Sequence, residues 1–267
     1  MKLKPRQLLL NLMTVAGDTP LTVQDAVSVC RLFGITENSA RVSLTRLSTE
    51  GLVQSAGRGC YRLTSRAEEL AADVRGWRIA LDTLRPWQGH WIGVHTAGLG
   101  RTDRAALKRR ERALEMSGFR PLEKDLFLRP DNLAGGVAAV RERLQRLGLE
   151  AQAPVFLLSG LDAAGQARAK ALWDTAALNA GYEDTRREME GWLQAADELD
   201  QEAAARESFV MGDQAIRQMV FDPLLPDSLV DAAARQAFVD TLLRFDRAGQ
   251  AIWRRLYLGT RDVSSAR

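Results

Sequence analysis

The 267-residue sequence predicts an α+β fold in three successive parts: a small domain of helices and a β-ribbon, an α/β middle and a helical end. Three observations carry this prediction. Apolar residues recur at helical spacing in the first 50 residues. A Gly-rich turn near residue 58 joins two short strand-like segments. Residues 166–258 are rich in Ala and Glu and lack strand-like alternation.

The first part contains three predicted helices. Pro5–Val15 is apolar at helical spacing, and Thr22–Phe33 repeats that pattern. A third helix starts after Thr36, whose hydroxyl is suited to cap it, and stops before Gly51, a residue typical of helix ends. On this helix three positions at i, i+4 and i+7 form a stripe expected to be buried, namely Ala40, Leu44 and Leu47.

Two short strands follow the third helix, Leu52–Ser55 and Cys60–Leu63. Ala56–Gly59 joins them, and its glycines permit a tight reversal with Arg58 at the tip. Three helices followed by a β-ribbon within residues 1–66 indicate a winged helix-turn-helix domain.

The exposed face of the third helix carries side chains suited to reading base edges in a DNA major groove. Short polar, guanidinium and methyl-bearing groups gather there, from Asn38, Ser39, Arg41, Val42 and Thr45. Arg46, Arg58 and Arg62 are expected to hold phosphate or to enter a minor groove. The predicted partner is a double-stranded DNA operator.

Charge supports this assignment. Residues 1–66 hold nine Lys and Arg against four Asp and Glu, whereas residues 166–267 hold 13 against 17. The middle residues, 67–165, hold 15 against 13. The excess of positive charge therefore lies in the part predicted to meet phosphate, as DNA binding requires.

The middle of the chain predicts a linking helix and a small α/β domain. A helix is expected over Ser65–Leu84, with the link itself at residues 67–85. Residues 86–165 then contain four predicted strands and two predicted helices. The strands are Trp87–His95, an extended segment starting at Ser117, Asp125–Arg129 and Ala153–Ser159. The helices are Asp103–Met116 and Gly136–Leu147. The order βαββαβ predicts a ferredoxin-like α/β sandwich.

Residues 166–267 are predicted to form a helical domain for dimerisation and effector binding. Phe221–Pro226 contains two prolines and interrupts the helical pattern as a rigid turn. The predicted helices are Ala167–Ala180, Asp184–Asp200, Gln201–Met219 and Leu229–Leu258.

Three motifs in this order resemble the PaaX family, the repressors of phenylacetate-catabolism genes: Tyr61–Thr64, Trp87–Trp91 and Asp222–Pro226. The resemblance covers nearly the whole chain. It implies a homodimeric repressor that leaves its operator when an aryl-acyl-CoA, typically phenylacetyl-CoA, binds. Asp227–Asp231 departs from the Trp-Pro-Gly-like segment common in the family, which puts the identity of the effector in doubt.

Candidate effector-binding residues are Trp87, Trp91, Arg104 and Lys108. The two tryptophans are suited to flank an aryl ring, although core positions are the alternative. Arg104 and Lys108 belong to a basic helical stripe that starts at Arg101 and ends at Arg112. Such a stripe is suited to phosphate, of coenzyme A or of DNA, but a solvated helix face remains the alternative.

Catalytic and metal signatures are missing from the sequence, which predicts no enzyme, no cofactor and no metal site. There is no Gly-x-Ser-x-Gly elbow, Walker loop or dinucleotide fingerprint. His90 and His95 lie five residues apart on a predicted strand, so they point to opposite faces. Cys30 and Cys60 do not make a disulfide framework.

No apolar run is long enough to cross a bilayer, and the N-terminus lacks a signal-peptide pattern, so a cytoplasmic protein is expected. Two other functions stay open. One is a winged-helix adaptor that binds an acidic protein, and the other is an enzyme that processes acyl-CoA.

Overall fold

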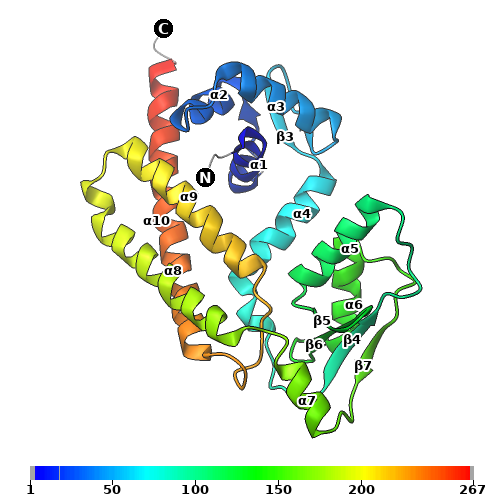
Figure 1. Ribbon diagram of the computed structural model, residues 1–267. Helices are drawn as coiled ribbons and strands as arrows, with labels where there is room; N and C mark the ends of the chain where they lie inside the picture. The colour runs from blue at the N-terminus through cyan, green and yellow to red at the C-terminus, as the bar shows by residue number, and fades with distance from the viewer. Residues whose placement is uncertain (1–3, 18, 265–267) are drawn as a thin grey trace. The chain divides into compact units, whose positions relative to one another are not determined.

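The computed structural model describes residues 4–17 and 19–264 and divides into two units (Figure 1). Unit 1 comprises residues 1–76, 194–212 and 246–267; unit 2 comprises residues 77–193 and 213–245. Each unit combines helices with one antiparallel sheet, which confirms the predicted α+β class. The predicted helical region, 166–267, contributes residues to both units.

Unit 1 begins with three helices and a three-stranded antiparallel sheet in the order β1-β3-β2. In the central pairing, Val53, Gln54 and Ser55 of β2 lie opposite Leu63, Arg62 and Tyr61 of β3. The elements are α1 (Pro5–Ala16), β1 (Leu21–Thr22), α2 (Val23–Leu32), α3 (Glu37–Thr49), β2 (Val53–Ser55), β3 (Cys60–Leu63) and α4 (Ser65–Arg75).

Local signals in the sequence place the ends of these helices. Thr22 and Asp25 form a capping box at the start of α2, each side chain meeting the other's backbone amide. Thr36 caps α3 by accepting a hydrogen bond from the Ser39 amide. Gly51, at φ +69°, follows α3 in the left-handed conformation that glycine adopts without strain. The predicted helix and strand positions of this region are thereby confirmed within a few residues.

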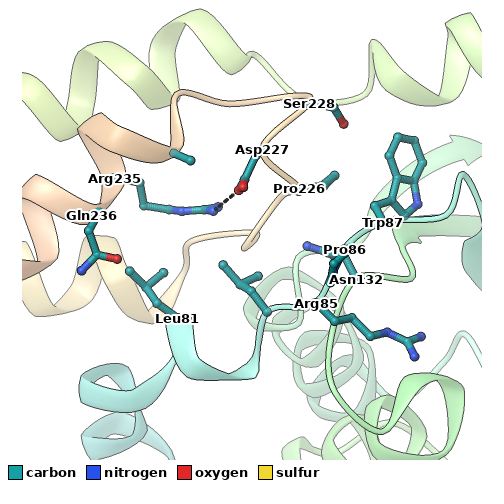
Figure 2. A pocket seen from close by; sticks show the side chains of 12 residues that line it. Leu81, Arg85, Pro86, Trp87, Asn132, Pro226, Asp227, Ser228, Arg235 and Gln236 are labelled. Atoms are coloured by element: carbon teal, nitrogen blue, oxygen red, sulfur yellow. Dashed lines mark hydrogen bonds and ion pairs between the residues drawn. The ribbon is translucent and has the colours of Figure 1, made fainter.

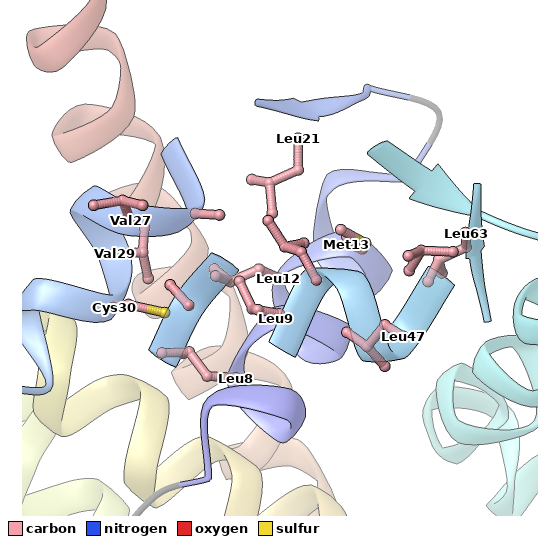
Figure 3. Packing of buried hydrophobic residues seen from close by; sticks show 14 of the residues in the cluster. Leu8, Leu9, Leu12, Met13, Leu21, Val27, Val29, Cys30, Leu47 and Leu63 are labelled. Atoms are coloured by element: carbon pink, nitrogen blue, oxygen red, sulfur yellow. The ribbon is translucent and has the colours of Figure 1, made fainter. Parts of the chain in front are cut away.

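A single hydrophobic core holds α1, α2, α3 and the sheet together, as Figure 3 shows. Leu8 and Leu9 of α1, Cys30 of α2 and Leu47 of α3 have no exposed surface. Leu44 and Ala40 complete the predicted stripe of α3, and both are buried. The opposite face of α3 is therefore the one turned to solvent.

Unit 1 also contains the first part of α9 (Gln201–Val220) and the last part of α10 (Ala232–Ser264). Three aromatic rings join these helices to the turn after α2. The ring of Phe33 lies 5.3 Å from that of Phe209 and 6.4 Å from that of Trp253. The turn that leads into α3 is therefore packed against both helices.

Unit 2 is built around a four-stranded antiparallel sheet in the order β5-β6-β4-β7. In β4, Gly93 leaves room for the ring of Phe156, which lies 2.6 Å from where a Cβ would stand. The elements are β4 (Trp91–His95), α5 (Arg104–Met116), β5 (Arg120–Glu123), β6 (Leu126–Pro130), α6 (Gly136–Leu147) and β7 (Val155–Leu158). This is the βαββαβ order predicted from the sequence.

The remaining helices of unit 2 are α7 (Ala163–Lys170) and α8 (Thr175–Ala195), followed by the second part of α9 and the first part of α10. Trp173, between α7 and α8, stacks on Trp91 of β4 with ring centroids 6.1 Å apart. In α8, Tyr182 stacks on Phe238 of α10 at 5.8 Å. Aromatic contacts therefore fasten these helices to the sheet and to each other.

Four predicted element ranges are wrong. The helix predicted over Asp184–Asp200 belongs to α8, which begins at Thr175 and ends at Ala195. The linking helix predicted through residue 84 ends at Arg75, because Gly76, a poor helix former, opens two short 3-10 turns, Gly76–Ile79 and Leu81–Thr83. The strand predicted from Trp87 starts at Trp91, since Gly89 at φ +81° is not extended. A break after Lys170 interrupts the helix predicted over 167–180, because Asp174 caps a new helix through the Ala177 amide.

Candidate nucleic-acid interface

The solvent face of α3 carries all six residues predicted for it to meet DNA. These side chains are exposed, namely Asn38, Ser39, Arg41, Val42, Thr45 and Arg46. Val42 is an apolar side chain 39% exposed on this polar face, where a thymine methyl would be a suitable partner. The Thr45 hydroxyl donates to the Arg41 carbonyl oxygen at 3.1 Å. The buried stripe of α3 thus fixes which side chains the helix presents.

Arg41 is held by an acidic residue at the start of the same helix. Its Nε and Nη2 donate to Oε1 of Glu37 at 3.0 and 2.9 Å, and Arg31 reaches Oε2 of Glu37 at 3.1 Å. We call these three residues the Glu37 clasp. The hydrogen bond from Arg41, followed by the charges of Arg41 and Arg31, lowers the pKa of the Glu37 carboxyl. The pair therefore favours the ionised form of Glu37, and the Arg41 guanidinium turns toward this carboxylate.

The β2–β3 ribbon presents the other two predicted DNA-binding residues. Arg58, in the turn between the strands, and Arg62, on β3, are both exposed. Leu63 is buried next to Arg62, so the alternation along β3 points these neighbours to opposite sides. Thr64 ties the end of the ribbon to the end of α3 by donating to the Gly51 carbonyl at 2.8 Å.

In unit 2, Asp222–Pro226 forms a tight turn between α9 and α10, the Asp222 turn. Asp222 is 5% exposed; its carboxylate accepts from the Tyr182 hydroxyl at 2.5 Å and from the Leu224 amide at 2.7 Å. Burial raises the pKa of Asp222, whereas these hydrogen bonds oppose the rise. Asn132 donates to the Leu224 carbonyl at 2.8 Å, which ties the turn to the loop after β6.

A cavity of about 480 Å³ lies beside the Asp222 turn in unit 2 (Figure 2). Its size is in the range usual for small-molecule sites. Its walls combine apolar side chains with a few polar and charged groups. They are Leu81, Leu84, Arg85, Pro86, Trp87, Asn132, Pro226, Asp227, Ser228, Ala232, Arg235 and Gln236.

Possible metal ligands and the two cysteines do not gather into one site among the described residues. Residues 4–17 and 19–264 contain no group of three or more His, Cys, Asp or Glu side chains able to hold a metal ion. Cys30 and Cys60 are free, and burial raises the pKa of the Cys30 thiol to about 11. Within those same residues, no helix has the length and apolar character needed to cross a membrane.

Comparison with known proteins gives matches at both ends of the chain. Residues 11–67 match the family described as PaaX-like protein, and residues 173–255 match the PaaX-like protein C-terminal domain. Over 244 residues the chain is 29% identical to the transcriptional repressor PaaX of Escherichia coli K12, covering 82% of this chain and 72% of that protein. The chain belongs to the PaaX family.

A solved structure, that of the uncharacterized protein Rv0674 from Mycobacterium tuberculosis, has a similar fold. The TM-score is 0.56 at 23% sequence identity, covering 94% of this chain and 99% of the other. At this identity the likeness speaks for the fold alone. Membership of the PaaX family confirms the resemblance seen in the sequence, and it confirms the assignment to transcription regulation rather than to enzymes.

The four predicted effector residues of this PaaX-family chain lie in three different settings. Trp87 lines the cavity. Trp91 has no exposed surface; its ring lies 5.0 Å from that of Trp87, and its Nε1 donates to Gln166 at 3.0 Å. Arg104 and Lys108 are exposed on α5 and are not among the residues that line the cavity. The structure therefore brings together the two tryptophans but not the two cations.

Sequence reasoning missed three residues that shape these sites in the PaaX-family chain. One is Glu37, whose position four residues before Arg41 is the spacing that favours a helical ion pair. Arg235 and Asp227, which pair beside the cavity, gave no local signal. Their partnership depends on how the Asp222 turn folds.

Proposed function

We propose that this chain is a DNA-binding transcriptional repressor whose N-terminal part is a winged helix-turn-helix domain. One observation carries the proposal: a hydrophobic core buries one stripe of α3 and leaves exposed, on the opposite face, five side chains suited to base edges and Arg46, which is suited to phosphate. The proposal also rests on the similarity to the E. coli repressor.

In the proposed complex, Arg41 and Asn38 contact base edges, while Val42 and Thr45 offer methyl groups to thymine. Arg46, Arg58 and Arg62 hold phosphate or enter the minor groove. Two subunits, paired through their C-terminal helices, place their α3 helices in major grooves about 34 Å apart, or a multiple of that spacing. A pseudo-palindromic operator would match this two-fold arrangement.

The proposed effector is an aryl-acyl-CoA such as phenylacetyl-CoA. Of the four residues predicted to contact it, Trp87 lines the cavity, Trp91 packs behind Trp87, and Arg104 and Lys108 do not line it. Release from DNA requires only that the effector bind the DNA-free state more tightly than the DNA-bound state. Both α9 and α10 contribute residues to each unit, so a change in unit 2 has a covalent route to the domain that carries α3.

Fluorescence anisotropy tests the proposal. The full chain is titrated against its own upstream intergenic DNA and against a scrambled duplex, with and without phenylacetyl-CoA. Selective binding that the ligand relieves is the expected result. Selective binding that the ligand leaves unchanged would remove this effector from the proposal, and equal binding to both duplexes would favour a protein-binding adaptor.

Replacing Arg41 with alanine is expected to weaken operator binding by about 1–3 kcal/mol and to relax the base preference at one position. The reason is that a guanidinium makes two hydrogen bonds to one base edge, which alanine cannot replace. The measurement compares affinities for operators changed one base pair at a time. Arg31→Ala is the matched control, because Arg31 belongs to the same clasp but lies outside α3. Equal loss on all sequences would make Arg41 a phosphate contact.

Replacing Arg58 with alanine is expected to reduce the slope of log affinity against log salt by about one unit. Each phosphate contact releases condensed cations from DNA, and the loss of one such contact lowers the slope accordingly. Arg187→Ala, which removes an exposed arginine of α8, provides a control for net charge. An unchanged slope for Arg58→Ala would place the turn of the ribbon away from DNA.

A further inference from the structure

The cavity of unit 2 has a charged side and an apolar side. Figure 2 shows Arg235 and Trp87 on opposite sides of it, with Leu81 on the wall below Arg235. Asn132 and Gln236 add amide groups to the lining. An apolar cavity with a few convergent polar groups is the usual form of a small-molecule site.

Arg235 is a buried cation with an exposed carboxylate partner. Its side chain is 2% exposed, whereas that of Asp227 is 79% exposed, and their ion pair is long at 3.3 Å. A stronger hydrogen bond joins Nη1 of Arg235 to the Leu225 carbonyl at 2.6 Å. The guanidinium is therefore anchored without Asp227, which water can solvate once it is displaced.

The backbone around Arg235 supports this exchange. The hydrogen bond to the Leu225 carbonyl stays in place when Asp227 moves away, so the guanidinium keeps a buried partner. Asp227 is mostly solvent-exposed in this pair, so an incoming acid group displaces a carboxylate that water readily solvates. An acid group that reaches Arg235 gains a charge-assisted hydrogen bond to a buried guanidinium.

We propose that this cavity binds an elongated organic anion, whose acid oxygen replaces Asp227 on Arg235 and whose aryl-sized apolar end lies toward Leu84, Pro226 and Trp87. The indole of Trp87 is fixed for such a contact, because its Nε1 donates to the His90 carbonyl at 2.5 Å. The acid group is a carboxylate or a phosphate. The binding of such an anion is inferred from the cavity alone. Any effect of this binding on DNA affinity rests on the proposed repressor function.

Isothermal titration calorimetry on the full chain tests the site, with phenylacetate as the carboxylate probe and phenylacetyl-CoA as the phosphate-bearing probe. Asp227→Asn is expected to tighten binding of the active probe about two- to fivefold, because the largely solvated Asp227 carboxylate no longer competes for Arg235. Arg235→Gln is expected to weaken it about 10- to 100-fold. The probe that responds identifies the acid group.

Asp184→Asn is the matched control, since Asp184 is an exposed acid of α8 that also pairs with an arginine but does not line the cavity. It should bind as the unchanged chain does. The proposal is overturned if neither probe binds, or if Asp227→Asn leaves the affinity unchanged or lowers it. Should Arg235→Gln fail to fold, the Asp227→Asn result decides alone.

The same variants in the DNA-binding assay separate this inference from the proposed function. If Asp227→Asn tightens the ligand but the ligand never relieves operator binding, the site stands and the effector role fails. If the ligand relieves operator binding with equal potency for Asp227→Asn and the unchanged chain, the effector role stands and this cavity is not its site.

Discussion

Replacing Gly118 with alanine is expected to lower the free energy of unfolding of unit 2 by about 2–5 kcal/mol. A Cβ at this position would lie 2.6 Å from the Pro223 carbonyl oxygen and 2.8 Å from its Cα, both backbone atoms that cannot move aside easily. The φ of +74° adds about 1–2 kcal/mol of strain for an L side chain, and overpacking adds about 1–3 kcal/mol. Because Pro223 belongs to the Asp222 turn, the ligand affinity of the cavity should fall as well.

Urea unfolding followed by tryptophan fluorescence measures this loss, since five of the six tryptophans belong to unit 2. Two glycine variants separate its causes. Gly160→Ala, in the same unit, shares the positive φ but meets open space, and Gly98→Ala has neither feature. A Gly118→Ala midpoint equal to that of Gly160→Ala would show that the close approach of the Asp222 turn is not rigid.

Replacing Leu44 with alanine is expected to destabilise unit 1 by about 2–5 kcal/mol and to abolish operator binding. Leu44 is 2% exposed in the apolar stripe that packs α3 against its core, so the deletion leaves a cavity beneath the exposed face of the helix. Hydrogen exchange of α3 amides, together with anisotropy on operator DNA, measures both effects.

Val42→Ala provides the contrast on the same helix. Val42 is 39% exposed, and its replacement should change stability by less than about 0.5 kcal/mol while it weakens operator binding through a lost methyl contact. If Leu44→Ala retained full operator affinity, α3 would not be the DNA-reading element. If Val42→Ala alone destabilised unit 1, the assignment of its exposed face would be wrong.

Prediction from sequence succeeded where the determining forces were local. Thr22 and Thr36 cap helices through residues three positions away, and the stripe on α3 follows from helical spacing alone. The fold of the Asp222 turn was visible only as a two-proline break, because its partners Tyr182 and Asn132 lie 40 and roughly 90 residues away. Contacts of that separation leave no periodic signal.

Among the candidate site residues, exposure was easier to anticipate than pairing. All eight predicted DNA-binding side chains are exposed, because a surface position follows from the buried face of its own element. In the predicted basic stripe, however, Arg101 lies before the start of α5 and pairs with Asp125. The neighbouring Arg110 of α5 is buried against Glu150 and the Gly100 carbonyl. Whether a cationic side chain is available to a ligand depends on ion-pair partners that are distant in the sequence and come close only in the folded chain.

The Glu37 clasp bears on how the proposed repressor would search a chromosome. Two arginines and one glutamate together carry a single positive charge at the head of α3, so random phosphate attracts this helix less than its arginines alone would. Weaker attraction shortens each pause on unrelated sequence and speeds sliding and hopping. Only a site whose bases accept the Arg41 hydrogen bonds in place of Glu37 would bind the helix for long. The protein would then move quickly along unrelated DNA and stay bound at its specific site.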